Sequence, residues 1–292
     1  MTVLVVGDIV TDIVAVHGGE MAVGSDTPAA ITITAGGAAA NTAAWLASLD
    51  VPVTLVAVVG SDAAGAERVE ELRAAGVRCL VRSAVGASTG SIVVLSGGGD
   101  RTMLVDRGAN GLLSSADIGP ASAGARHVHV SGYTLLDPGT RPAGLAALAL
   151  ARERGATASV DAASAAPLRS VGGRAFLSWT RPSDLLFANL DEARALVEPP
   201  PASPELLAAR LAAEAGGAAV VKRGADGAFW AAGTAIVSVP ARPASVVDPT
   251  GAGDAFAAGV LARWLDGGSP ADCLAAGATL GARAVTRVGS RP

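Results

Sequence analysis

One stretch of the chain joins a glycine-rich turn to a carboxylate, at the start of a predicted helix: Asp248-Pro249-Thr250-Gly251-Ala252-Gly253-Asp254. The two glycines allow a sharp turn in which successive N–H groups converge on an anion at the positive helix end. Apolar residues then recur at helical spacing up to Gly267, which places Asp254 in the first turn. Asp254 either stabilises the helix dipole alone or accepts a proton from a hydroxyl attacking a bound phosphoryl group. The glycine turn favours the second interpretation, because a simple helix cap needs no anion-binding turn.

A second glycine motif, Gly36-Gly37 followed by Asn41, directly precedes another helical pattern. Taken alone, such a motif favours close packing of a helix against a sheet. The first apolar run, residues 3–6, is typical of a buried parallel strand and leads through a loop to Asp12. A carboxylate accepts two hydroxyl hydrogen bonds well, so Asp12 is a candidate for binding a polyol. Asp8 is interpreted as an ordinary turn residue.

Polar residues also follow two later apolar strands. Asn189 and Glu192 come after residues 184–188, and the carboxyl ends of strands in α/β sheets are where ligands gather. Their spacing is also that of a capping box, and both interpretations can hold together. After the strand at 218–222, a glycine loop is either a hairpin turn or a nucleotide contact. The candidates for contacting a nucleotide are Lys222, Arg223, Gly224 and Gly227, and the sequence does not show which of the two cations would reach a phosphate.

These motifs together resemble the ribokinase-like, or PfkB, family of sugar and nucleoside kinases, from Asp12 to Gly289. The resemblance implies ATP-dependent transfer of the γ-phosphoryl group to a hydroxymethyl group of a small sugar, with Asp254 as the general base. It implies an anion hole built from the amides of Gly251, Ala252, Gly253 and Asp254. It also implies that the sugar hydroxyls are bound by Asp12, Gly36, Gly37, Asn41 and Asp254.

The resemblance further implies ATP and Mg²⁺ as cofactors. Asn189 and Glu192 would organise Mg²⁺ and the nucleotide phosphates, with Glu192 acting through water, since Mg²⁺ retains several waters and needs few carboxylates. The remaining nucleotide contacts would be Lys222, Gly224, Gly227, Gly251 and Gly253. K⁺ is expected beside the anion hole, on Asp248, Thr250, Ala284, Arg287 and Gly289.

Apolar runs alternate with helical patterns along the chain, which predicts βα units around a mainly parallel sheet. Two segments, 13–34 and 82–106, break this alternation: they are rich in β-branched residues, and a hairpin turn is expected at 97–100. The resemblance implies one domain over 1–292, an α/β doubly wound sheet flanked by helices, in which these segments form a small β-sheet lid. It also implies a homodimer through that lid. A lid would exclude water from the phosphoryl donor.

Composition sets further limits. The chain has 292 residues, 50% of them hydrophobic, and a formal net charge of −4. With no basic tract, a nucleic-acid partner is not expected. Two cysteines predict no disulfide framework, and without a long apolar run or leader pattern we expect a cytoplasmic protein with no membrane contact. His127 and His129 share one face of a strand and are interpreted as structural rather than as a metal pair.

Two alternatives stay open. A nucleoside kinase would want an aromatic face for the base; the lid segments contain no Phe, Tyr or Trp, but Tyr133 follows a predicted strand. Ala38 stands where ribokinases often carry Lys, which weakens an assignment to ribose itself. A non-catalytic sugar or nucleotide sensor is the other alternative. It is disfavoured because a sensor has no need of a base aimed at a phosphate.

Overall fold

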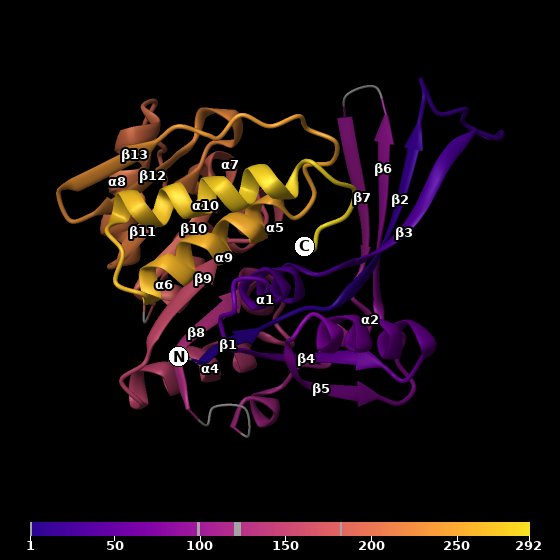
Figure 1. Ribbon diagram of the computed structural model, residues 1–292, viewed down its shortest axis with the longest axis horizontal. Coiled ribbons are helices and arrows are strands. Elements are labelled where there is room, and N and C mark those ends of the chain that lie inside the picture. Colours follow the sequence, from indigo (N-terminus) through magenta and orange to yellow (C-terminus); the bar gives the residue numbers. More distant parts are fainter. Residues whose placement is uncertain (1, 98–99, 120–123, 182) are drawn as a thin grey trace.

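The computed structural model describes residues 2–97, 100–119, 124–181 and 183–292. Its larger sheet has nine strands in the order β13-β12-β11-β10-β9-β8-β1-β4-β5 (Figure 1). The strands from β11 to β5 in this order pair in parallel, whereas β12 and β13 are antiparallel. Their bounds are β1 Thr2–Val6, β4 Val53–Gly60, β5 Arg78–Ala84, β8 Ala125–Ser131, β9 Thr157–Asp161, β10 Leu185–Asn189, β11 Ala218–Lys222, β12 Ala228–Ala232 and β13 Ala235–Val239.

Helices cover both faces of this sheet, so its central strands are buried on both sides and read as continuous apolar runs. Along β1, Val3 and Val5 join one hydrophobic core, and Leu4 and Val6 join the other. The first core packs against α1 Ala38–Ala47, α2 Ala63–Ala74, α9 Ala252–Leu265 and α10 Pro270–Ala284. The second packs against α4 Arg141–Glu153, α5 Ala165–Val171, α6 Gly173–Thr180, α7 Leu190–Leu196 and α8 Pro204–Ala215, beside the short α3 Gly132–Leu136.

Local signals place the helix starts. Asp62 caps α2, Ser203 caps α8, and Ser269 with Asp272 forms a capping box on α10. Pro204 and Pro270 stand in the first turns of α8 and α10, where a missing N–H costs nothing. No helix in the described part of the chain is long and apolar enough to cross a bilayer.

The smaller sheet has the order β3-β2-β6-β7 and projects from the body of the molecule (Figure 1). Its strands are β2 Val10–His17, β3 Ala29–Gly36, β6 Gly90–Gly97 and β7 Asp100–Asp106; β2 pairs with β6 in parallel and the other pairs are antiparallel. The lid segment expected from 82 onward thus enters this sheet only at Gly90, because Arg82 pairs with Val58 in the large sheet. The hairpin turn expected at 97–100 falls partly on residues 98–99, outside the described residues.

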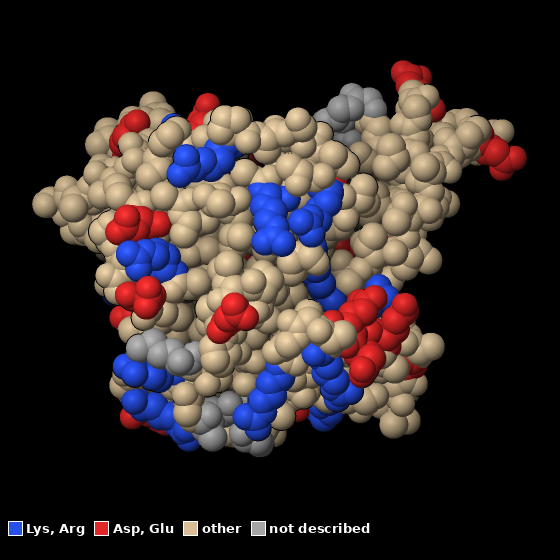
Figure 2. Space-filling view, viewed as in Figure 1, with Lys and Arg blue, Asp and Glu red and all other residues tan. Residues whose placement is uncertain are grey.

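The fold prediction is confirmed: a large, mostly parallel sheet is flanked by helices and accompanied by a smaller sheet. The predicted strands at 3–6, 184–188 and 218–222 correspond to β1, β10 and β11. The antiparallel edge strand β13 was not anticipated. On the face seen in Figure 2, acidic and basic side chains are interspersed.

Candidate active site

A cavity of about 350 Å³ lies where the carboxyl ends of β1, β9, β10 and β11 meet the small sheet. Ligands gather at this edge in open α/β sheets. The small sheet supplies an apolar wall of Ile92, Val94 and Met103. The polar lining consists of Asp8, Asp12, Asn41, Tyr133, Asp161, Asn189, Glu192, Lys222, Thr250 and Asp254. Among the described residues, several predicted ones do not line it: Gly36, Gly227, Asp248, Ala252, Ala284, Arg287 and Gly289.

Asp254 stands in the first turn of α9, as the sequence predicts. The helix is capped by Gly251 in a left-handed conformation, with φ of 75°. A Cβ added there would come 2.5 Å from the carbonyl oxygen of Ser290, so both the backbone conformation and the close approach require glycine. The first N–H groups of a helix have no intrahelical acceptor. At the start of α9, Gly251 and Gly253 line the cavity, and the Ala252 N–H donates to the Pro249 carbonyl. The turn can therefore bind an anion.

The environment of Asp254 makes its carboxylate basic. Burial raises the pKa of Asp254 to about 8; the hydrogen bond from Asn41 opposes this rise, and the nearby carboxylate of Asp161 adds to it. Asn41 Nδ2 donates to Asp254 Oδ2 over 2.8 Å. The side chain stays partly open to the cavity, where a bound molecule can reach it. A carboxyl whose pKa lies near neutral pH suits general base catalysis.

A cation stands beside the glycine turn. Lys222 Nζ donates to Asp161 Oδ2 over 2.7 Å, joining the ends of β11 and β9. Its ammonium lies against Gly253, 3.3 Å from the place that a Cβ would occupy. Burial lowers the pKa of Lys222, but Asp161 and Glu192 outweigh it and the net direction is upward. The ammonium therefore stays charged next to the anion-binding turn.

Arg223, which the sequence could not separate from Lys222, points elsewhere. Its guanidinium lies 4.1 Å from the ring centre of Phe229 and donates to the carbonyl of Asp226. Gly224 lines the cavity, whereas Gly227 closes the β11–β12 hairpin. A Cβ on Gly227 would collide with the carbonyl oxygen of Val239. Gly227 is therefore part of a hairpin turn, which was one of the two interpretations of this loop.

Asn189 and Glu192 form the capping box of α7. Asn189 Oδ1 accepts from the Glu192 N–H over 2.9 Å, and Glu192 Oε2 accepts from the Asn189 N–H over 2.7 Å. Both residues also line the cavity, so the two interpretations of this motif are compatible. Burial raises the pKa of Glu192 to about 7, with Lys222 opposing. The carboxylates of Glu192 and Asp161 supply oxygen ligands at this end of the cavity. Such a sparse set fits a Mg²⁺ ion that keeps most of its waters.

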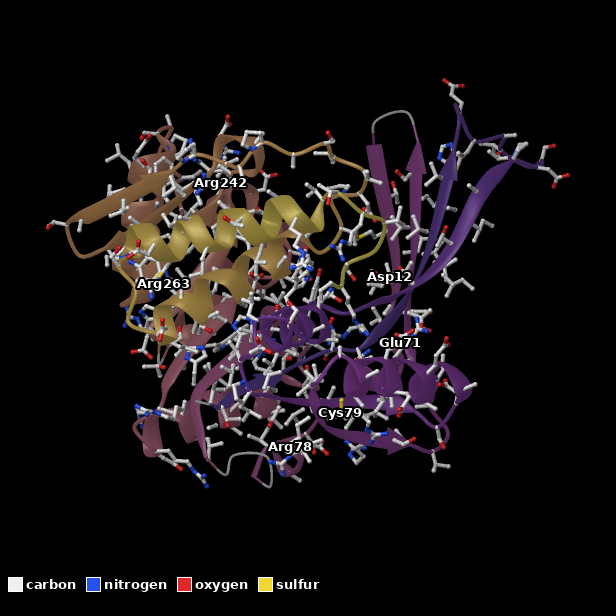
Figure 3. The ribbon with its side chains drawn as sticks, in the orientation of Figure 1. Asp12, Glu71, Arg78, Cys79, Arg242 and Arg263 are labelled. Carbon is white, nitrogen blue, oxygen red and sulfur yellow. The ribbon has the colours of Figure 1, made fainter. Side chains whose placement is uncertain are left out.

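The opposite end carries Asp12 and the first glycine motif. Asp12, on β2, lies buried where the small sheet meets the body (Figure 3). A Cβ on Gly36 would collide with its carboxylate. Gly37 has φ of 99°, and a Cβ there would lie 2.5 Å from the Asp8 carbonyl oxygen. Both glycines thus allow the backbone to approach the two aspartates closely.

Asp8 is a site residue that the sequence interpretation missed. It is 7% exposed and lines the cavity at the end of β1. Oδ2 accepts from the Ala38 N–H over 3.0 Å, but Oδ1 is buried without a hydrogen-bond partner. A buried carboxylate oxygen without a donor is costly, which suits it to accept a ligand hydroxyl. Its position at a strand end was the available signal.

The predicted cation loop lies beside a C-terminal segment. Asp248 Oδ1 accepts from the Thr250 N–H over 2.9 Å, and Oδ2 accepts from the Gly289 N–H over 3.1 Å. The Val285 carbonyl accepts from the N–H of Asp248. Three of the five cation candidates are therefore adjacent. Among the described residues, no group of three or more His, Cys, Asp or Glu is placed to hold a metal ion.

Sequence comparison agrees with these motifs. Residues 1–292 match the pfkB family of carbohydrate kinases. A curated relative, the ATP-dependent ribose-1-phosphate kinase of Halopiger xanaduensis, is 33% identical over 264 residues, which cover 88% of this chain and 82% of the relative.

Solved structures agree as well. The adenosine kinase from Sinorhizobium meliloti superposes with a TM-score of 0.88 at 26% identity, covering 99% of this chain and 95% of the other. A candidate ribokinase II from E. coli, solved with ATP and Mg²⁺, superposes with a TM-score of 0.85 at 26% identity, covering 99% and 94%.

Proposed function

The chain belongs to the PfkB family of carbohydrate kinases and is thus a phosphotransferase; from this premise we propose that it transfers the γ-phosphoryl group of ATP to a hydroxymethyl group of a small sugar. One observation carries the proposal. A basic carboxylate, Asp254, faces a cavity from the same helix turn whose amides and neighbouring Lys222 can bind the transferred phosphate.

In the proposed mechanism, Asp254 accepts the proton of the sugar hydroxyl as that oxygen forms a bond to the γ-phosphorus. The bond from that phosphorus to the bridging oxygen breaks, and ADP leaves with the electron pair. The amides of residues 251–254 and the ammonium of Lys222 stabilise the charge that develops on the phosphoryl oxygens. Bound Mg²⁺, held by Glu192 and Asn189 largely through water, would neutralise phosphate charge.

The carboxylates at the other end favour an uncharged polyol. Asp8 and Asp12 can accept sugar hydroxyls, and Asn41 can donate to a sugar oxygen. Among the described lining residues, Lys222 is the one cation, and it is paired with Asp161. An anionic sugar would therefore meet more negative charge than positive charge. This is why we place a neutral sugar ahead of a sugar phosphate or sugar acid.

A nucleoside is the second candidate, and Tyr133 supports it. Its side chain lines the cavity, and Arg107 stands 5.8 Å from the ring centre, paired to Asp137 over 3.2 Å. Burial and the charge of Asp8 raise the pKa of Tyr133, so the phenol stays neutral and can contact a base. The apolar wall of Ile92, Val94 and Met103 would complete such a subsite.

The test is ADP release from Mg·ATP across neutral pentoses and hexoses, ribose 1-phosphate, an acidic keto-sugar, adenosine and cytidine. Turnover with a neutral sugar is the expected result. Selective turnover with adenosine or cytidine would replace the sugar by a nucleoside, and selective turnover with ribose 1-phosphate would overturn the charge argument. Sugar binding without turnover by folded, ATP-binding protein would support a sensor instead.

Two finer properties belong to the same proposal. K⁺ bound beside Asp248 and Thr250 would stiffen the anion-binding turn, and equal rates in K⁺ and tetramethylammonium would refute this.

The second property is a dimer, in which a second copy of the chain would cover the small sheet. The residue row Ile33, Ile13, Val93 and Leu104 lies on the face opposite Asp12, and its outer members Ile33 and Leu104 are 66% and 57% exposed.

Two copies can bury this apolar face against itself about a twofold axis, as isologous dimers do. Sedimentation should then show a dimer for the wild type and a monomer for Ile33→Lys. A wild-type monomer at assay concentration would refute the dimer.

A further inference from the structure

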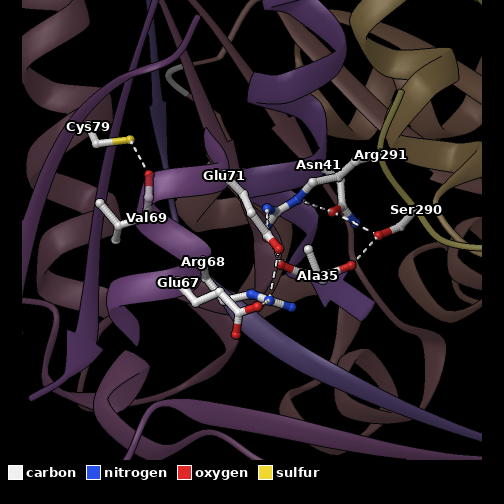
Figure 4. Close-up of polar contacts among 10 residues, drawn as sticks. Ala35, Asn41, Glu67, Arg68, Val69, Glu71, Cys79, Ser290 and Arg291 are labelled. Atoms are coloured by element: carbon white, nitrogen blue, oxygen red, sulfur yellow. Dashed lines mark hydrogen bonds and ion pairs between the residues drawn. The ribbon is translucent and has the colours of Figure 1, made fainter. Parts of the chain in front are cut away.

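A two-residue segment far along the chain, Ser290-Arg291, is packed beside Asn41 (Figure 4). Ser290 is 1% exposed, and its carbonyl accepts from Trp45 Nε1 over 2.9 Å. Its Oγ lies 3.0 Å from Asn41 Oδ1 and 2.9 Å from the Ala35 carbonyl. The same residue is the one that leaves no room for a side chain on Gly251. Ser290 therefore lies against both Gly251, in the anion-binding turn, and the side-chain carboxamide of Asn41.

Arg291 reaches three acceptors with one guanidinium. Its Nη2 donates to the Gly36 carbonyl over 2.9 Å, Nε to Asn41 Oδ1 over 3.4 Å, and Nη1 to Glu71 Oε2 over 3.5 Å (Figure 4). Its side chain is 12% exposed. Burial lowers the pKa of Arg291 to about 10, which leaves it charged at neutral pH. Glu71 in turn pairs with Arg68 over 2.8 Å, so the guanidinium is anchored from α2.

These contacts decide which way the Asn41 amide points. A carboxamide can present either its oxygen or its NH₂ to a neighbour. Arg291 carries donors and no acceptor, so the side of Asn41 that faces it must be the oxygen. Asn41 Nδ2 is then directed at Asp254, where the 2.8 Å hydrogen bond is found. Ser290 alone does not decide this, because its single hydroxyl hydrogen can be donated either to Asn41 Oδ1 or to the Ala35 carbonyl.

We infer that Ser290 and Arg291 are positioning residues for the phosphoryl-transfer site: they hold Asn41 so that its NH₂ faces Asp254 and a substrate oxygen, and they fix Gly36 beside it. This inference rests on the proposed function for its catalytic meaning. The geometry itself does not depend on it. Neither residue contacts the cavity; both act through Asn41 and the backbone of β3.

The consequence is a measurable change at Asp254. If Asn41 rotates, its oxygen faces the carboxylate and the donated hydrogen bond is lost, so the protonated acid becomes favoured. The other charged groups around Asp254 stay in place: Asp8 after β1, Asp161 at the end of β9 and Lys222 at the end of β11. Loss of a hydrogen bond to a charged group moves a carboxyl titration by about one pH unit.

The experiment is a ¹³C NMR titration of the carboxyl carbons in aspartate-labelled full-length protein without ligands. Asp254 is identified as the carboxyl with a midpoint near pH 8 that disappears in Asp254→Asn. In Arg291→Met we expect this midpoint to rise by about one pH unit. Arg263→Met is the matched control. It removes an arginine paired to Asp266 over 3.1 Å on the far end of α9, and the midpoint should not move.

Arg291→Lys keeps the charge but not the planar fork, so a smaller rise in the same direction is expected, and it serves if the methionine variant does not fold. Ser290→Ala tests the second contact in the same way. An unmoved midpoint in folded Arg291→Met or Arg291→Lys would overturn the inference. In the Arg291 variants kcat should also fall, and it should partly recover at higher pH, where Asp254 again loses its proton. If the Asp254 midpoint moves in the Arg291 variants but the wild type turns over no substrate, the positioning of Asn41 is supported and the proposed phosphoryl transfer is refuted.

Discussion

Asp254 and the pair His127 and His129 are ionisable groups whose pKa values are shifted by desolvation, yet they differ in what surrounds them. Burial raises the pKa of Asp254 to about 8, and it lowers the pKa of His127 to about 3 and that of His129 to about 4. His127 Nδ1 lies 2.9 Å from Thr157 Oγ1, and Ser159 Oγ lies 2.8 Å from both rings. Neither histidine lines the cavity, whereas Asp254 does.

The difference shows that a perturbed pKa marks function only when the group can meet a ligand. The histidines have hydrogen-bond partners between β8 and β9 and are packed against Trp264 and Phe187. Asp254 instead shares an open space with the unpartnered oxygen of Asp8 and with the glycine turn. Strong desolvation accompanies both cases, so it does not distinguish them.

The largest expected effect is that of Asp254→Asn. Replacing the base with an isosteric amide should lower kcat by about 10²–10⁴, while the KM for the sugar changes little. Steady-state kinetics on the substrate found in the panel measures this. Asp266→Asn, at the opposite end of the same helix, is the control and should keep wild-type kcat. Equal losses in the two variants would remove the distinction between Asp254 and any other helix carboxylate.

Gly251→Ala should come next. The added methyl meets Ser290 and the left-handed backbone, so the turn must shift, and we expect kcat to fall by about 10²–10³ as for a lost anion-hole donor. Gly267→Ala separates the two causes, because Gly267 also has a positive φ of 81° but nothing within 4 Å of its Cβ. That control should cost about 1 kcal/mol of stability with no loss of kcat. Similar kinetics in both variants would contradict the proposed role of the turn.

Stability without ligand should show the smaller effect, with opposite signs for the two regions. The folded pKa of Asp254 lies above its unfolded value, so its contribution is present below about pH 4 and lost as the pH rises through about 8. The folded pKa values of the histidines are depressed, so their contribution is present above about pH 6.5 and lost as the pH falls.

Denaturant unfolding across pH measures both contributions. Asp254→Asn should flatten the decline of the free energy of unfolding between pH 6.5 and 8, and His129→Gln should flatten its decline below pH 6.5. If Asp254→Asn instead steepens the decline above pH 6.5, the carboxylate is not the basic group that the structure indicates.

Local sequence pattern predicts much of this molecule, because strands buried on both faces must be apolar and glycine turns require particular backbone conformations. It therefore places Asn41 and Asp254 at helix starts, whereas Asp12, expected at the end of a loop after the first strand, lies within β2. The strand-end position of Asp8 was a signal in the sequence, but its hydrogen bonding was not: Oδ2 accepts from the Ala38 N–H, whereas Oδ1 is buried without a partner. The local pattern also could not find Ser290 and Arg291, whose partners are some 250 positions away in the sequence. Long-range contacts of this kind leave no periodicity to read.

The most direct test of the account is the pH dependence of kcat/KM for wild type and Asp254→Asn, measured between pH 5.5 and 9.5 with saturating Mg·ATP. For the wild type we expect kcat/KM to rise with pH through a midpoint near pH 8 and to level off above it, because the enzyme must lose the Asp254 proton before this carboxylate can act as the base. In Asp254→Asn the residual rate should be low and lack this rising limb. A rising limb that persists unchanged in the variant would contradict the assignment of Asp254 as the general base.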